Sequence, residues 1–230
     1  RYQKASNEEA EPDEIEEQAP VIVAGVGRFG QIVCRLLRAN NIPSVALDHA
    51  LDQIENLRLI QLKSYFGDAT RIQLLETAGI AEARLLVVAI DDRDRAVSMV
   101  RHVKQLYPEV WILARAFDRG HGYELREAGA DDVVSETYYS ALKLGGDALT
   151  AMGVHPERAR RMTQSFVASE KANEDQLFSA WRNIEEGIHF SPRYGELFMK
   201  LDESLGHAMR EDARQIEDEA PAWTPPRNNG

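Results

Sequence analysis

Residues 20–37 read PVIVAGVGRFGQIVCRLL, and this stretch decides the fold. A β-branched run leads into three closely spaced glycines, Gly25, Gly27 and Gly30, and a helical pattern of apolar residues follows at once. In a G-x-G-x-x-G turn the first glycine permits a tight bend, the second lets the backbone approach a phosphate, and the third lets helix pack on strand. Backbone N–H groups at the helix start then face an anion. The stretch therefore predicts a phosphate-binding turn.

Strand-like and helical segments continue to alternate up to about residue 152. The apolar runs span residues 21–26, 44–48, 62–68, 84–91, 110–116 and 130–134, and helical stretches begin near Arg28, Leu51, Thr70, Asp92, His121 and Thr137. This alternation favours parallel strands with right-handed crossovers, so we predict an α/β fold with a doubly wound, Rossmann-like sheet. The runs LLVVAI (85–90) and VWILA (110–114) are continuously apolar, which predicts central strands buried on both faces.

The flanking segments differ in composition from this nucleotide-binding domain, which we place at residues 20–152. Residues 1–19 carry seven acidic and two basic side chains and predict an acidic linker from something upstream. Residues 153–187 are helical but charged, with a narrow apolar stripe, and predict a crossover or dimerisation arm that packs on a partner subunit. Residues 188–230 predict an acidic C-terminal tail.

Composition excludes several classes of function. The chain has 230 residues and a net charge of -11, which disfavours a nucleic-acid partner. Neither a secretory signal nor a run of about 20 apolar residues is present, so the chain reads as a soluble, cytosolic-type protein. One cysteine and six scattered histidines predict neither a disulfide framework nor a metal site.

An acidic residue stands where a ribose should bind. Asp48 ends the run SVALD, eighteen residues after Gly30. A carboxylate there accepts hydrogen bonds from the 2'- and 3'-hydroxyls and repels a 2'-phosphate, so the turn favours AMP, NAD or ATP over NADP. His49 follows directly; it is predicted to contact the ribose, although a surface histidine explains it equally well.

Two further stretches follow strands whose carboxyl ends should meet at the same edge. They are Gly67–Thr70, with Asp68, Ala69 and Thr70, and Ala89–Asp92, with Ile90, Asp91 and Asp92. Ligands in open α/β sheets gather at that edge, so these residues are candidates for nucleotide contact. Helix capping by Asp68 or Thr70, and by Asp91 or Asp92, is the alternative.

An enzymatic alternative rests on one pair of residues. Tyr139 and Lys143 fit Y-x-x-x-K, in which the lysine lowers the tyrosine pKa so that it can act as an acid in a stand-alone NAD-dependent oxidoreductase. The glycine turn is spaced differently in that family, and no second domain is evident to orient a substrate. Cys34 on an apolar helix side and His121 in RGHG read as core and turn residues. We therefore predict no catalytic residues and no enzyme.

Six motifs in order resemble the cytoplasmic KTN (RCK-type) domain of Kef glutathione-gated potassium efflux systems. They cover about residues 20–170: VIVAGVGRFGQIV, VALDHALDQIENLR, YFGDATRIQLLETAGI, AIDD, ILARAFD and ETYYSALKLGGDAL. The resemblance implies a dimeric nucleotide-binding domain that gates an N-terminal membrane transport domain at the cytoplasmic face of the bacterial inner membrane. In that family glutathione holds the system closed and glutathione adducts of electrophiles open it. A flavoprotein-like ancillary subunit docks in some relatives.

The resemblance also implies roles for particular residues. The phosphate turn would comprise Gly25, Gly27, Arg28, Phe29 and Gly30, with Asp48 on the ribose and Asp68 and Ala69 on the adenine side. AMP is the nucleotide implied first and NAD(H) next. For glutathione, Arg35, one turn beyond Gln31, matches a family arginine. Ile60, Ser135 and Glu170 stand where the family has a phenylalanine, an arginine and an asparagine, which predicts weaker binding of an anionic tripeptide.

Overall fold

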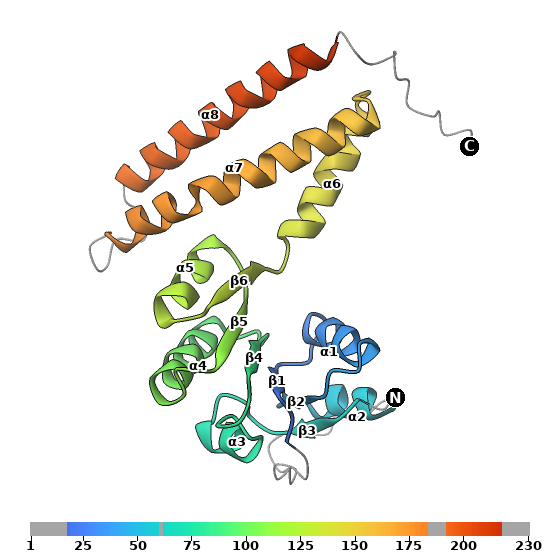
Figure 1. Ribbon diagram of the computed structural model, residues 1–230, viewed down its shortest axis with the longest axis vertical. Helices are drawn as coiled ribbons and strands as arrows, with labels where there is room; N and C mark the ends of the chain where they lie inside the picture. Colours follow the sequence, from blue (N-terminus) through green and yellow to red (C-terminus); the bar gives the residue numbers. More distant parts are fainter. Residues whose placement is uncertain (1–17, 60–61, 184–191, 218–230) are drawn as a thin grey trace, which may run out of the picture. The chain divides into compact units, whose positions relative to one another are not determined.

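The computed structural model describes residues 18–59, 62–183 and 192–217 (Figure 1). The chain divides into two compact units, Arg1–Glu136 and Thr137–Gly230. We describe the first as the sheet unit and the second as the helical unit, each by itself.

The sheet unit is built on six parallel strands. Their order is β3-β2-β1-β4-β5-β6, and every neighbouring pair is parallel. The strands are β1 (Val21–Ala24), β2 (Ser44–Asp48), β3 (Ser64–Phe66), β4 (Leu85–Val88), β5 (Trp111–Ala116) and β6 (Asp132–Ser135). This order confirms the predicted doubly wound, Rossmann-like sheet. Its switch point lies between β1 and β4, where ligands of such folds bind.

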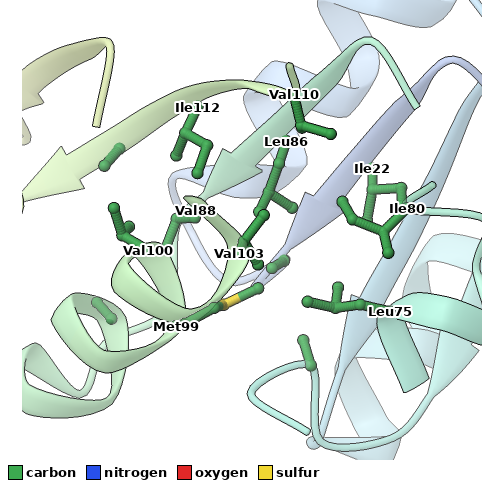
Figure 2. Packing of buried hydrophobic residues seen from close by; sticks show 14 of the residues in the cluster. Ile22, Leu75, Ile80, Leu86, Val88, Met99, Val100, Val103, Val110 and Ile112 are labelled. Carbon is green, nitrogen blue, oxygen red and sulfur yellow. The ribbon is translucent and has the colours of Figure 1, made fainter. Parts of the chain in front are cut away.

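Helices cover the sheet through two separate hydrophobic clusters. One cluster joins the β1 residues Val21 and Val23 to α1 (Gly30–Ala39) and α2 (Leu51–Leu59). The other joins Ile22 to α3 (Ile72–Thr77), α4 (Arg93–Leu106) and α5 (Arg119–Ala128), and Figure 2 shows part of its packing. Because successive side chains of a strand point to opposite faces, the two clusters lie on the two sides of β1.

The two strands predicted to be central differ in burial. β4 is buried along Leu86–Val88, whereas β5 alternates between covered and accessible residues. Ile112 and Ala114 are buried against the cluster that contains α4 and α5, but Trp111 on the other face is 54% exposed. The prediction that VWILA is buried on both faces is therefore wrong for β5. The uniform hydrophobicity of VWILA did not reveal that the helices of the sheet unit cover only one face of β5.

The helical unit contains α6 (Tyr138–Ala151), α7 (Pro156–Arg182) and α8 (Pro192–Glu217). α7 packs on both of the others, and α7 and α8 run side by side in Figure 1. α8 lies where the sequence predicts only an acidic tail. The missed signal is Leu201 and Leu205, one helical turn apart, after a proline suited to a first helical position. Leu205 is buried.

Within the described ranges, no helix combines the length and apolar character needed to cross a membrane.

Candidate ligand-binding site

The three glycines of the turn are required for different reasons. Gly25 has a φ of +89°, and a Cβ there would lie 2.7 Å from the backbone of Ala89. A Cβ on Gly30 would lie 1.9 Å from the carbonyl oxygen of Gly25. A Cβ on Gly27, by contrast, would meet nothing within 4 Å. The fold itself therefore requires Gly25 and Gly30 but leaves open space beside Gly27.

The turn also presents unused hydrogen-bond donors. α1 begins at Gly30, and its N-cap, Phe29, makes no side-chain capping bond. The carbonyl of Gly27 accepts from Gln31 N at 3.1 Å, but the N–H groups of Gly27, Arg28 and Phe29 have no acceptor among the described residues. Orphan N–H groups at a helix start, together with the helix dipole, favour an anion.

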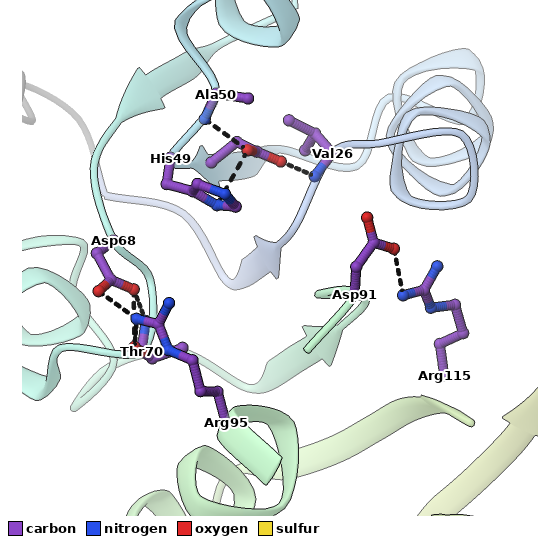
Figure 3. Close-up of polar contacts among 9 residues, drawn as sticks. Val26, His49, Ala50, Asp68, Thr70, Asp91, Arg95 and Arg115 are labelled. Atoms are coloured by element: carbon purple, nitrogen blue, oxygen red, sulfur yellow. Dashed lines mark hydrogen bonds and ion pairs between the residues drawn. The ribbon is translucent and has the colours of Figure 1, made fainter. Parts of the chain in front are cut away.

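Asp48 ends β2 and supports the turn directly. Its Oδ2 accepts a hydrogen bond from Val26 N at 2.7 Å, and its Oδ1 accepts one from Ala50 N at 2.8 Å (Figure 3). The residue is only 7% exposed. Each carboxylate oxygen has a second lone pair, so Asp48 can still accept ribose hydroxyls, its predicted role. His49 is largely exposed, with Nδ1 3.6 Å from Asp48 Oδ1.

A closed polar network holds the loop after β3. Asp68 Oδ1 accepts from Thr70 N at 3.1 Å and from Thr70 Oγ1 at 2.7 Å, while Arg95 of α4 donates to Asp68 Oδ2 and to Thr70 Oγ1. Burial alone would raise the pKa of Asp68, but the hydrogen bonds from Thr70 and Arg95 and the charge of Arg95 bring it below its usual value. Ala69 is buried, so it can offer a ligand little beyond its backbone.

The alternative prediction, that residues of these two loops cap helices instead of binding a nucleotide, holds for one of them. α3 has Arg71 as its N-cap, without a side-chain bond, so neither Asp68 nor Thr70 caps it. Asp92 does cap α4, because its Oδ1 accepts from Arg95 N at 3.0 Å. Asp91 caps nothing; it is 91% exposed and pairs with Arg115 at 2.7 Å.

Two arginines that sequence reasoning missed hold these loops, as Figure 3 shows. Arg95 ties the loop after β3 to α4. Arg115 of β5 donates through Nη2 to the carbonyl oxygen of Ile90, in the loop after β4, at 2.7 Å. The only available signal was an arginine inside the otherwise apolar run ILARA. The edge therefore combines open N–H donors, fixed acceptors and two anchored cations.

The described residues implied for glutathione lie on three elements, α1, β6 and α7. Gln31 and Arg35 are one turn apart on α1, with Arg35 exposed, and Ser135 ends β6. Ile60 lies outside the described residues. Glu170 lies on α7, in the helical unit.

The residues considered for catalysis do not form a site. Lys143 pairs with Asp147 at 2.5 Å on the surface of α6, and Tyr139 is exposed. Cys34 is buried, which raises the pKa of its thiol to about 11. His121 is buried and accepts a hydrogen bond at Nδ1 from Phe117 N at 3.1 Å. No group of three or more His, Cys, Asp or Glu among the described residues is placed to hold a metal ion.

Comparison with known proteins gives the family of this chain. The TrkA-N domain family matches residues 21–136, the span of the sheet and its glycine turn. The chain belongs to the TrkA-N domain family. The potassium efflux system KefB C-terminal domain matches residues 140–222, so the TrkA-N domain is followed here by a Kef-type helical region.

Several similar proteins are named as potassium-efflux proteins. The chain is 46% identical over 168 residues to the glutathione-regulated potassium-efflux system protein KefC of Escherichia coli O17:K52:H18, which covers 72% of this chain and 27% of that protein. The chain thus spans about a quarter of the length of the curated relatives it matches. These relatives confirm the predicted family resemblance, and their names describe potassium efflux and no enzymatic activity.

Solved structures agree with this assignment. The AMP-bound C-terminal domain of Kef from Shewanella denitrificans is 41% identical, with a TM-score of 0.64 over 70% of this chain and 98% of that one. The GsuK channel bound to NAD has a TM-score of 0.51 at 24% identity over 56% of this chain and 24% of that one, a likeness of fold alone.

Proposed function

We propose that this chain is the regulatory domain of a Kef-type potassium efflux transporter, and that an adenine nucleotide occupies its glycine turn. The observation that carries the proposal is the open space beside Gly27, next to N–H groups without acceptors. A position that the fold does not need to be glycine, yet is glycine, fits close approach by a phosphate. In this proposal the nucleotide is bound and is not converted to a product. Its binding favours one arrangement of the protein over another, by the difference between its affinities for the two.

AMP is the nucleotide we favour, and NAD(H) comes next. The Shewanella relative was solved in an AMP-bound form, and the phosphate of AMP suits the donors of Gly27, Arg28 and Phe29. Asp48 would accept from the ribose, and the loops carrying His49, Asp68, Ala69, Thr70, Ile90, Asp91 and Asp92 would border the rest of the nucleotide. Asp92 would act indirectly, because it caps α4.

The proposal includes several partners. The chain would form a homodimer and would work at the cytoplasmic face of the bacterial inner membrane, joined to an N-terminal membrane transport domain. A flavoprotein-like ancillary subunit could dock there. Glutathione or its adducts would be effectors through Gln31 and Arg35. Ser135 supplies no cation for the anionic tripeptide and Glu170 adds a negative charge, so its affinity would be lower than in relatives with an arginine and an asparagine at these positions.

Titration calorimetry with AMP tests the nucleotide assignment. We expect the parent protein to bind AMP and the variant Gly27→Ala to lose at least about 10-fold in affinity, because a methyl group then occupies the space for the phosphate. The melting temperature without AMP should barely change, since that methyl meets no protein atom within 4 Å.

The matched control is Gly122→Ala on α5, where a Cβ makes only ordinary contacts of 3.6 and 3.7 Å. This variant should bind AMP like the parent. The proposal fails if the parent binds no adenosine compound, or if Gly27→Ala binds AMP as tightly as Gly122→Ala does.

A further inference from the structure

Arg115 connects segments that are far apart in the sequence. Its side chain is only 10% exposed, and its two terminal nitrogens have different partners. Nη2 donates to Ile90 O and Asp91 Oδ1, both at 2.7 Å, whereas Nη1 lies 3.0 Å from Glu136 Oε2. One nearly buried guanidinium is therefore shared between the loop after β4 and the end of β6.

The same side chain lies close to the glycine turn. The guanidinium carbon of Arg115 is 5.9 Å from the centre of the Phe29 ring, and Phe29 carries one of the unused N–H groups. The loop that Arg115 holds also packs on the turn, because the Ile90 nitrogen lies 2.7 Å from the position a Cβ on Gly25 would take. An anion bound in the turn would add negative charge on the Phe29 side of Arg115.

The other partner of Arg115 lies at the boundary between the two units. Glu136 is the last residue of the sheet unit, and Thr137 begins the helical unit. Glu136 is anchored through two contacts, its backbone N to Ala116 O at 3.0 Å and its carboxylate to Arg115. Of the two contacts described for Glu136, release of the carboxylate would leave the backbone bond to Ala116, just before the connection to the helical unit begins.

We propose that Arg115 is a positioning residue that transmits nucleotide occupancy to the Glu136–Thr137 junction. This inference rests on the proposed nucleotide site. A phosphate in the turn competes with Glu136 for the guanidinium, because a doubly charged phosphate attracts arginine more strongly than one carboxylate does. Binding draws Arg115 away from Glu136, and the helical unit becomes free to change its orientation.

Reciprocity of coupling gives a test with a definite sign. If Glu136 competes with the phosphate, then Glu136→Gln removes the competitor and should tighten AMP binding, by at least about 5-fold at the low end of allosteric couplings. Arg115→Gln should weaken AMP binding, and in the double variant the Glu136→Gln effect should vanish. Calorimetry on the full chain measures all four affinities.

Distances between the units provide the second readout. Nitroxide labels on Glu82→Cys and Gln164→Cys, both exposed positions, report the arrangement by pulsed electron resonance in labelled chains diluted with unlabelled ones. The native Cys34 is buried with a raised thiol pKa and should stay unlabelled. AMP should shift the parent distribution, and Glu136→Gln without AMP should already resemble the AMP-bound parent.

Glu124→Gln is the matched control, because Glu124 lies 4.0 Å from Arg93 and makes no contact with Arg115. It should leave both the affinity and the distances unchanged. If the parent binds AMP but Glu136→Gln changes neither readout, or merely lowers stability, the inference is overturned while the nucleotide assignment stands. A parent that binds no AMP overturns both.

Discussion

Asp48 stabilises the glycine turn in addition to its predicted role in ribose binding. Both of its oxygens accept backbone N–H groups, from Val26 and Ala50, and the residue is almost fully buried. Replacing it would leave those donors unpaired, which costs about 1–3 kcal/mol for each buried group. A variant such as Asp48→Ala therefore cannot separate ribose binding from support of the turn, and the ligand must be changed instead.

We expect 2'-deoxy-AMP to bind the unmodified protein about 10- to 150-fold more weakly than AMP. A hydrogen bond to a charged acceptor contributes roughly 1.5–3 kcal/mol, and the deoxy ligand lacks the hydroxyl that Asp48 would receive. Competition calorimetry gives the ratio, with AMP as the reference ligand. Equal affinities would show that Asp48 supports only the turn.

At the residue scale, residues whose partners are close in the sequence were easier to predict than residues whose partners are far away. Gly25, Gly27, Gly30 and Asp48 could be proposed together from the sequence because the motif fixes their spacing around one turn. Arg95 and Arg115 were not, because their acidic partners lie 27 and 24 residues away and only the folded sheet brings them together. Local patterns thus predict candidate residues for a site, while the polar network around these residues depends on tertiary structure.

At the scale of elements, acidic N-caps fix the helices that follow β4 and β5. Asp92 caps α4, and Asp118 caps α5 by accepting from His121 N at 2.9 Å. The first turn of α5 therefore places His121 in the core. Burial lowers the pKa of His121; Arg93 and Arg115 lower it further and Asp118 opposes them. The surroundings of His121 on α5 therefore disfavour the charged form of its imidazole.

We expect acidification to weaken the sheet unit through His121. In the unfolded chain histidine titrates near pH 6.5, whereas the folded pKa is lower, so below about 6.5 the unfolded state binds a proton first. The free energy of unfolding should fall as the pH drops from 7 through the folded pKa. Urea unfolding at several pH values measures this, and His121→Gln should flatten the dependence despite its lower overall stability.

The control for that titration is His102→Gln, because His102 is exposed on α4. This variant should retain the pH dependence of the parent. A pH profile that His121→Gln leaves unaltered would mean that other groups govern stability in this range.

Sequence periodicity predicted the elements of the sheet unit better than those beyond it. All six strands and the helices between them appear close to their expected positions, because alternation of β and α segments is a strong local signal. α8 was missed because acidic residues dominate the composition around Leu201 and Leu205. The exposed face of β5 was missed because hydrophobicity alone does not indicate what covers a strand.

At the scale of the whole chain, the two units differ in how they bury apolar residues. The sheet unit contains both hydrophobic clusters, whereas none of the residues of α6 is buried. α6 nevertheless exposes large apolar side chains, including Tyr139, Leu144 and, just beyond its end, Met152. The proposed homodimer would cover them in the manner of an apolar interface.

We expect residues 18–136 alone to be monomeric and still to bind AMP, whereas the full chain should be a dimer. The glycine turn and both clusters lie in the sheet unit, which accounts for AMP binding, and we assign the dimer contact to the exposed apolar residues of α6 and Met152, which residues 18–136 lack. Sedimentation at micromolar concentration gives the mass of each protein. A monomeric full chain, or a dimer of residues 18–136, would contradict this assignment.

The position of Cys34 bears on how the protein would respond to electrophiles. The chain has one sulfhydryl group, and it lies in the core with a pKa raised to about 11, so almost none of it is the reactive thiolate at neutral pH. Folded chains should therefore escape alkylation at Cys34, and exposure to an electrophile should leave no covalent adduct on this chain. Under the proposed function, a response of this chain to electrophiles would depend on ligands that dissociate, so dialysis should restore the initial state.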